Sequence, residues 1–406
     1  MSGPLARRLG PVDAVAIGLG SMIGAGVFSA FAPAAAAAGS GLLIGLVIAA
    51  VVAYCNAMSS ARLAAVYPES GGTYVYGRER LGPFWGYLAG WSFVVGKTAS
   101  CAAMALTVGF YVWPGQAHAV AAGAVVALTT LNCFGVQRSA LVTRVIVAAV
   151  LAVLAAVVVA IVASGAGDGG RLDVGSDATV GGILQAAGLL FFAFAGYARI
   201  ATLGEEVRDP ARTIPRAIPL ALGITLVVYL AVAVALLAVL GSTALAATTA
   251  PLTAAVRVAG LAWLVPVVTA GAALAAIGSL LALILGVSRT TLAMARDGHL
   301  PRGLARLHAG VPRHAEIVVG VVVTVLAASV DLIGAIGFSS FGVLVYYAIA
   351  NCAAWNLRRG VVPALGLLGC AVLAFALPVS AVLTGAGVLV AGAVAYLVRC
   401  RIRRNS

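Results

Sequence analysis

Charge is what this 406-residue chain has least of: only 9% of its residues are Asp, Glu, Lys or Arg, whereas 63% are hydrophobic. Soluble globular proteins carry roughly 25% charged residues, because their surfaces face water. Twelve acidic and 25 basic side chains cannot cover the surface of a soluble protein of this length. The scarcity of charge therefore excludes an ordinary soluble protein and indicates a polytopic membrane protein.

The sequence also has few cysteines and a single lysine, Lys97. The six cysteines are scattered without a CxxC pair, so the sequence predicts neither a disulfide framework nor a metal site. The net charge of +13 does not come from a basic patch interleaved with aromatic residues, which excludes a nucleic-acid partner. No nucleotide-binding loop, haem ligand cluster or soluble catalytic module is attached. We therefore expect no cofactor, and neither an ATP-driven pump nor a respiratory subunit.

Long uncharged runs are what the sequence has in abundance. A helix needs roughly 20 apolar residues to cross the hydrocarbon core of a bilayer, and twelve such runs are bounded by charge, Pro or Gly. They cover residues 12–38, 41–66, 82–112, 117–134, 140–163, 181–203, 216–240, 263–287, 315–330, 332–356, 361–377 and 379–398. We therefore expect an all-α polytopic membrane protein with about twelve transmembrane helices and only loops between them.

The distribution of basic residues indicates the orientation of the chain. Most of the 25 Lys and Arg residues fall at the two termini and in every second loop, which the positive-inside rule assigns to the cytoplasm. Arg171 and Arg257 lie in loops on the other side, and Lys97 and Arg199 lie within spans. We expect a multi-pass protein of the cell membrane, surrounded by lipid, with both termini cytoplasmic.

Two spans carry glycine-containing strings near their middle. The first span reads GSMIGAGVF from Gly20 to Phe28, and the sixth reads FFAFAGYAR from Phe191 to Arg199. A helix broken at mid-membrane depth leaves backbone groups unpaired unless they face a protein-lined cavity or a ligand. Either string alone is also explained by close helix packing. An offset of five spans inverts the second copy relative to the first, as in transporters with inverted repeats.

The chemistry of the two expected breaks fits a zwitterion. Amides left free at Ala25 and Gly26 can bind a carboxylate at the positive end of a half-helix. Carbonyls near Ile23, and near Phe194 and Ala195, can accept hydrogen bonds from an ammonium group.

These strings resemble the amino acid-polyamine-organocation (APC) transporters. Residues 20–28 look like the family's GxxIGxGxF motif, and residues 191–210 look like its sixth-helix pattern, which ends here in EEVRDP. Residues 68–74 and 288–298 resemble the loops after its second and eighth helices, so the resemblance covers about residues 10 to 360. It implies the leucine-transporter-like fold. Residues 1–163 would form a first five-helix repeat, residues 164–356 its inverted copy, and residues 357–406 two further helices and a basic cytoplasmic tail.

The resemblance also implies amino acid transport by alternating access. The substrate backbone contacts would be Ile23, Gly24, Ala25, Gly26, Phe194, Ala195 and Gly196. Tyr197 or Phe194 would supply an aromatic lid over the substrate. We expect a secondary carrier rather than an enzyme, coupled to protons or working by exchange. A channel, or an exchanger for another small organic amine or acid, is the alternative.

Ionisable groups inside spans are functional candidates because they are costly in hydrocarbon. Lys97, midway along the third span, can bind substrate, pair with a carboxylate or carry a proton, unless it snorkels to an interface. Arg199 follows the second break and is either a gate contact or a snorkelling side chain. Glu205 and Glu206 are candidate carboxylates of a cytoplasmic gate, or members of a solvated ion-pair cluster.

Two further observations bear on the coupling ion and on substrate charge. Proton-coupled relatives often carry a lysine in the fifth helix, whereas residues 141–162 contain none, which leaves the coupling ion open. A sodium site would need a hydroxyl from the eighth span, where Ser279 is the candidate, and one hydroxyl is a thin ligand set. Because Lys97 and Arg199 are basic and lie deep in spans, we expect a neutral or acidic amino acid. The amino acid itself and the oligomeric state do not follow from the sequence.

Overall fold

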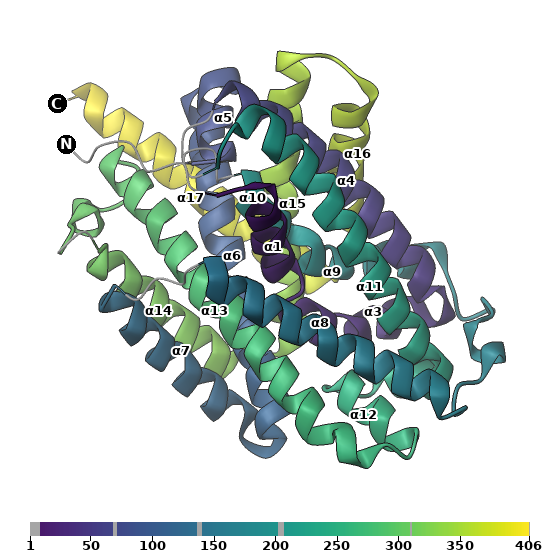
Figure 1. Cartoon of the computed structure of the whole chain (residues 1–406). Coiled ribbons are helices and arrows are strands. Elements are labelled where there is room, and N and C mark those ends of the chain that lie inside the picture. Colours follow the sequence, from purple (N-terminus) through teal and green to yellow (C-terminus); the bar gives the residue numbers. More distant parts are fainter. Residues whose placement is uncertain (1–8, 68–70, 136–139, 202–206, 309–310, 406) are drawn as a thin grey trace.

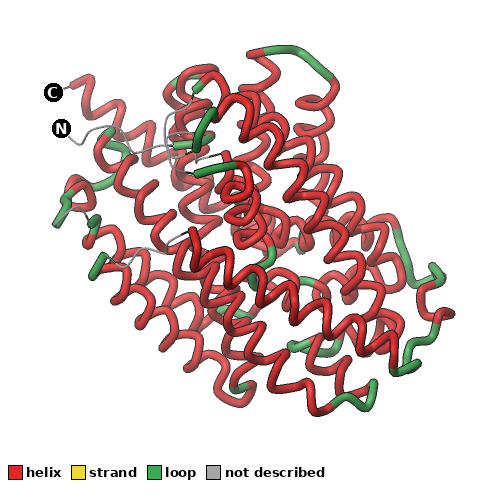
Figure 2. The backbone as a smooth tube through the Cα atoms, in the orientation of Figure 1, coloured by secondary structure: helices red, strands yellow, loops and turns green. Residues whose placement is uncertain are grey.

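The computed structural model describes residues 9–67, 71–135, 140–201, 207–308 and 311–405 (Figure 1). Within these residues the chain forms helices joined by short loops, without a strand (Figure 2). The first half contains α1 (Pro11–Met22), α2 (Gly26–Ser29), α3 (Phe31–Ala38), α4 (Leu42–Val66), α5 (Thr73–Leu81), α6 (Pro83–Val112), α7 (Ala117–Cys133) and α8 (Ala140–Ala163).

The second half contains α9 (Val180–Phe194), α10 (Ala198–Ala201), α11 (Pro210–Ala246), α12 (Pro251–Val258), α13 (Val265–Arg296), α14 (Arg313–Ser329), α15 (Leu332–Leu357), α16 (Val361–Ala376) and α17 (Val379–Asn405). Nine stretches of the described chain are long and apolar enough to cross a membrane. The helices α7 and α14, with 17 residues each, and α16, with 16, are near the lower limit of about 17 residues for a spanning helix.

Each of the twelve expected spans coincides with one helix or, for the first and sixth spans, with successive helical segments. The helices α11 and α13 are longer than the spans 216–240 and 263–287, because charged residues outside the apolar run continue the helical turn. Two segments that the sequence indicated as loops are helical, which corrects that expectation. The helices α5 and α12 each bury one side, Tyr74 and Tyr76 in α5 and Leu252 and Val256 in α12, so packing stabilises a short helix there.

Helices that lie five spans apart pack against each other. The pairs are α4 with α11, α6 with α13, α7 with α14, and the segments α1 to α3 with α9 and α10. This is the pairing of a leucine-transporter-like fold, in which an inverted repeat places equivalent helices around one centre. The division into repeats at residues 163 and 356 stays a prediction.

The two ends of the bundle are distinguished by the chain segments that they carry. One end, called the termini end, holds Leu9, α5 and the residues that follow α13; the other, called the far end, holds α12 and the connection between α8 and α9. Figure 1 shows α5 near the top and α12 near the bottom of the view. An even number of spans brings Leu9 and the end of α17 to the termini end (Figure 1).

Candidate functional site

The first expected break is present between α1 and α2. The amide of Ile23 still donates to the carbonyl of Leu19, at 2.6 Å, but the ψ angle of 57° at Ile23 is not helical. Helical structure resumes at Gly26. The carbonyl of Ala25 accepts hydrogen bonds from the Phe28 amide and the Ser29 hydroxyl, at 3.0 and 2.8 Å. The first amides of α2 therefore form the start of a helix, where a chain has no helical acceptors of its own.

The second expected break follows α9, which ends at Phe194 and continues as a 3-10 turn over Ala195–Tyr197 before α10 begins. The Nζ atom of Lys97, in α6, donates a hydrogen bond to the carbonyl oxygen of Ala195 at 3.1 Å. Lys97 is only 7% exposed and has no carboxylate within ion-pair distance among the described residues. A cation at the carboxyl end of α9 is favoured by the helix dipole, because that end carries partial negative charge.

The two breaks pack directly on each other through glycine. A Cβ atom placed on Gly26 would lie 2.6 Å from the Cβ of Ala193 in α9. A Cβ atom on Gly196 would collide with the carbonyl of Ser21 and lie 2.7 Å from the amide nitrogen of Met22. Real Cβ atoms do not approach that closely, so side chains at these two positions would force the half-helices apart. Glycine is required here for close approach of two backbones.

Tyr229 of α11 joins the two breaks through one hydroxyl group. Its oxygen lies 2.6 Å from the carbonyl oxygen of Met22 and 3.1 Å from that of Ala193, so the hydroxyl donates to both ends. The side chain is fully buried, and its ring contacts Phe194 with centroids 5.1 Å apart. A buried carbonyl without a donor costs about 1–3 kcal/mol. Tyr229 therefore stabilises the broken state of both helices at once.

The two broken helices are also linked at their outer ends. At the termini end, the Arg208 amide donates to the Leu9 carbonyl at 2.9 Å. At the far end, the amide and hydroxyl of Ser40 donate to the two carboxylate oxygens of Asp177, at 2.9 and 2.5 Å. These hydrogen bonds lower the pKa of the Asp177 carboxyl. Ser40 follows α3 and Asp177 precedes α9, so the link joins the end of one broken helix to the start of the other.

The structure brings the sequence-predicted substrate contacts together. Ile23, Ala25, Phe194, Ala195 and Tyr197 are buried, as are Gly24 and Gly26, whereas Gly196 is partly exposed. Ala25 forms a small apolar cluster with Val108 of α6 and Ala276 of α13. The ring of Tyr197 packs on Tyr347 of α15 with centroids 5.0 Å apart. Substrate contact by these residues stays a prediction.

The candidate gate residues and the candidate sodium ligand differ in whether the structure describes them and in how deeply they are buried. Arg199 lies in α10 and is partly exposed, whereas Glu205 and Glu206 lie outside the described residues. Ser279 is buried in α13, where its hydroxyl donates to the Ala275 carbonyl at 2.5 Å and leaves no room for a Cβ atom on Gly24. This hydrogen bond uses the proton of the hydroxyl and leaves the lone pairs of its oxygen, so by itself it does not decide whether Ser279 can bind a cation.

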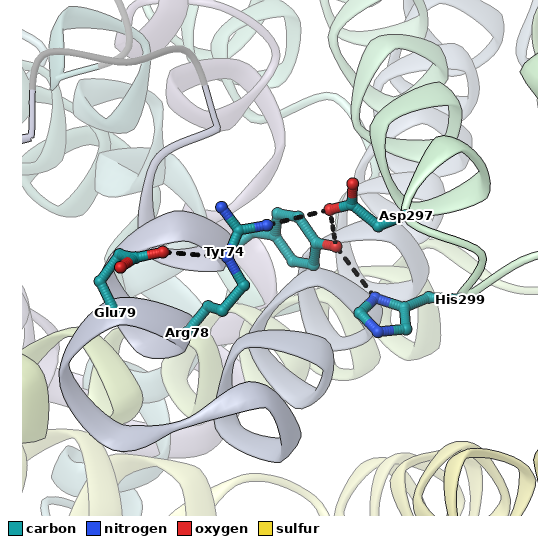
Figure 3. A network of polar contacts seen from close by, with 5 residues as sticks. All are labelled: Tyr74, Arg78, Glu79, Asp297 and His299. Atoms are coloured by element: carbon teal, nitrogen blue, oxygen red, sulfur yellow. Dashed lines mark hydrogen bonds and ion pairs between the residues drawn. The ribbon is translucent and has the colours of Figure 1, made fainter. Parts of the chain in front are cut away.

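Sequence reasoning missed a polar network at the termini end (Figure 3). The Asp297 carboxylate accepts hydrogen bonds from the Tyr74 hydroxyl, at 2.5 Å, and from Arg78, at 3.1 Å. The Tyr74 oxygen also lies 2.9 Å from Nδ1 of His299. Burial and the Asp297 carboxylate raise the pKa of the Tyr74 phenol, which keeps it a donor. The sequence had indicated both segments, because residues 68–74 and 288–298 match family motifs. It does not show, however, that α5 contacts the residues at the end of α13.

Glu316 is a second residue that sequence reasoning did not single out. It lies in the first turn of α14 with no exposed surface. Among the described residues, neither carboxylate oxygen makes a hydrogen bond of good geometry, although Ser288 and Asn132 lie beside it. A buried carboxyl group between membrane helices is a candidate proton-binding group.

Comparison with known proteins agrees with this geometry. The amino acid permease family model matches residues 13–392. A Mycobacterium tuberculosis protein described as an uncharacterised transporter is 72% identical over 410 residues, which cover 99% of this chain and 93% of its own. The branched-chain amino acid permease of Bacillus subtilis is 26% identical over 76% of this chain and 71% of its own. Vacuolar cationic amino acid transporter 4 of Arabidopsis thaliana is 30% identical over 86% of this chain and 63% of its own.

The family match covers nearly all of the helical bundle, including both broken helices. The chain is thus a multi-pass membrane transporter, not an enzyme, and it belongs to the amino acid permease family of the APC superfamily.

Proposed function

We propose that this transporter is a secondary carrier that moves an amino acid across the cell membrane by alternating access. The observation that carries the proposal is the direct packing of the two breaks, with Gly26 on Ala193 and Gly196 on Ser21. The amides that begin α2 favour a carboxylate, and the carbonyl end of α9 favours an ammonium group. A zwitterion bound between them uses both ends. Its contacts would be residues 23–26 and 194–196, with Tyr197 or Phe194 as a lid.

The position of Lys97 supports a neutral or acidic substrate. Its ammonium group donates to the Ala195 carbonyl, so a substrate ammonium would use the remaining carbonyls near Ile23 and Phe194. A second cation within about 6 Å of a buried ammonium costs a few kcal/mol at the effective dielectric constant of a protein. A substrate with a cationic side chain is therefore disfavoured beside Lys97. The named relatives do not separate the charge classes, because one is a branched-chain and another a cationic amino acid carrier.

The buried ionisable groups support coupling to protons, or exchange, rather than coupling to sodium. Lys97 and Glu316 are both buried in membrane helices and can each take up or release a proton. Ser279 supplies the one hydroxyl that sequence reasoning assigned to a sodium site, and one hydroxyl is a thin ligand set for a hard cation. Replacing Glu316 by Gln removes the titrating proton and keeps the shape, so this variant should lose proton-driven uptake while retaining exchange.

The distribution of basic residues supports an orientation with the termini end in the cytoplasm. Glu205, Glu206 and Arg199 would then belong to the cytoplasmic gate, and the network of Tyr74, Asp297 and His299 would lie on the cytoplasmic side as well. Cysteine labelling from outside the cell tests this orientation, with Ser406→Cys expected to react only after the membrane is permeabilised.

The carrier is tested in proteoliposomes. Amino acids are first screened by thermal shift, and each hit is then measured by counterflow with unlabelled substrate inside. Stimulated uptake of labelled substrate supports a carrier. Conductance that does not saturate, without counterflow, indicates a channel and overturns the proposal.

A further inference from the structure

A groove of about 570 Å³ runs between α7 and α14, which lie side by side in the bundle (Figure 1). Its walls are aliphatic and exposed side chains, including Val126 of α7 and Ile317, Val321 and Val325 of α14. Phe134 lies at one end and is 75% exposed. In a membrane protein such apolar, outward-facing side chains lie against lipid. The groove is therefore a depression in the membrane-facing surface, of the size that small-molecule sites have.

The floor of the groove is formed by small residues that hold the two helices close. A Cβ atom on Gly320 would lie 2.5 Å from the γ atoms of Thr129 across the contact. Small residues at such crossings let membrane helices approach closely. The larger side chains on either side of this contact then stand above it as walls. The shape of the groove is thus built into the packing of α7 on α14.

Arg313 gives the groove one charged end. It is the first residue of α14, it is exposed, and its Nε atom donates to the carbonyl of Cys133, the last residue of α7, at 3.1 Å. This contact anchors the guanidinium where both helices end, at the termini end of the bundle. Among the described residues no carboxylate lies within ion-pair distance of Arg313.

The surroundings of Arg313 are also positively charged. From Arg302 to Ala315 the chain contains three arginines and two histidines but no acidic residue. Arg302 and Arg306 are exposed, in the 3-10 turn beside α14 and directly after it. The next acidic residue, Glu316, points into the protein and has no exposed surface. An anion at the end of the groove therefore meets several cations and no exposed carboxylate from this segment.

We propose that this groove binds one anionic phospholipid, with an acyl chain between α7 and α14 and its phosphate on Arg313. A groove that is apolar along its length and basic at one end matches the acyl chain and the phosphate of such a lipid. An apolar helix from a second copy of the protein would fill the groove but would bring no anion to Arg313. Each basic residue near an anionic membrane surface adds about 1 kcal/mol, which is roughly fivefold in affinity.

A second groove supplies an internal control. It has a volume of about 390 Å³, lies between α8 and α13, and is lined by Val153, Val267 and other apolar residues without a charged side chain. The same physical argument predicts no preference for anionic lipid there. The two grooves therefore separate the effect of the charged end from that of an apolar depression.

The test is lipid binding to the purified full chain in neutral detergent, followed by native mass spectrometry. The probes are phosphatidylglycerol and phosphatidylcholine with identical acyl chains, and inorganic phosphate. The wild type should retain one phosphatidylglycerol more tightly than phosphatidylcholine. Arg313→Gln should weaken phosphatidylglycerol binding about fivefold and leave phosphatidylcholine binding unchanged. Arg212→Gln, at an exposed arginine on α11, is the matched control and should behave as wild type.

Filling the groove tests the acyl-chain part of the site. Val321→Trp should displace the bound lipid, whereas Val267→Trp in the second groove should not, and thermal unfolding checks that both variants are folded. The proposal is overturned if Arg313→Gln binds phosphatidylglycerol as the wild type does. It is also overturned if inorganic phosphate alone accounts for the Arg313 dependence, or if Val321→Trp dissociates a dimer instead of releasing lipid.

Discussion

The break in the first span is built from backbone and small side chains, whereas the break in the sixth span carries charge and aromatic rings. At the first break Gly24 and Gly26 pack on Ser279 and Ala193. At the second, Lys97 binds the Ala195 carbonyl, and Phe194 and Tyr197 contact other rings. The two helices occupy equivalent places in an inverted repeat, yet their chemistry differs.

This difference follows from the polarity of a helix. The first break contains the amide start of α2, and amides favour an anion without help from side chains. The second break exposes the carbonyl end of α9, where a cation is favoured and Lys97 supplies one. The fold thus places the two breaks against each other, with helix ends of opposite polarity.

The largest expected effect comes from a side chain at the first break. Gly26→Leu would place a Cβ atom 2.6 Å from Ala193 and separate the half-helices, so uptake should be abolished. Gly223→Leu is the control, because a Cβ atom there meets nothing within 4 Å. Transport assays and surface expression should show both proteins inserted but only the control active. Normal uptake by Gly26→Leu would contradict the role of this break.

Removing the charge at the second break should change selectivity. Lys97→Met frees the Ala195 carbonyl and removes the buried cation, so arginine should compete for the site at least about tenfold better than with wild type. Lys97→Arg keeps the charge and should keep the wild-type ranking. Competition assays at neutral pH measure both. If arginine already displaces substrate from wild type better than alanine, serine or glutamate does, this interpretation of Lys97 is wrong.

Removing the hydroxyl that joins the breaks should destabilise both equally. Tyr229→Phe leaves the carbonyls of Met22 and Ala193 without this donor, at a cost of about 1–3 kcal/mol. Thermal unfolding should show a lower midpoint than for wild type and for Tyr54→Phe, a change at an exposed tyrosine of α4. A midpoint equal to that of the control would show that the two contacts contribute nothing.

The far-end link between the two broken helices should depend on pH. The pKa of Asp177 is lowered from 3.8 by the Ser40 hydrogen bonds, so the link stabilises the protein above about pH 4. It is lost as the pH falls through the lowered pKa. Asp177→Ala should reduce the unfolding midpoint at neutral pH, and this difference should vanish in acid. Asp173→Ala, in the same loop, should show no such pattern.

The smallest effect is expected for sodium at the first break. Because the first break offers one candidate hydroxyl ligand, that of Ser279 beside Gly24, we expect uptake to continue in choline buffer at constant pH. Ser279→Ala should stay within about twofold of wild type, since one hydroxyl is a poor site for a hard cation. Collapse of uptake in choline would show that the first break holds a cation after all.

Much of the helical architecture could be predicted from the sequence, because the lipid environment constrains each helix separately. A chain in lipid must satisfy its backbone within each helix, so long apolar runs predict spans without knowledge of their neighbours. The strings around Gly24 and Gly196 likewise predicted where helices stop, because glycine next to small residues at mid-membrane depth is a local signal. The helices α5 and α12 were missed because their stability comes from burial against other segments.

The sequence by itself determined the membrane class, the twelve spans and the two places where helices break, because hydropathy and glycine act through nearby residues. Only the tertiary structure decided that Lys97 binds Ala195, that Tyr229 joins both breaks and that Glu316 is buried. These features depend on side chains that meet from helices far apart in the chain. No periodicity or local composition reports which faces of two distant helices will meet, because packing of the whole bundle selects them.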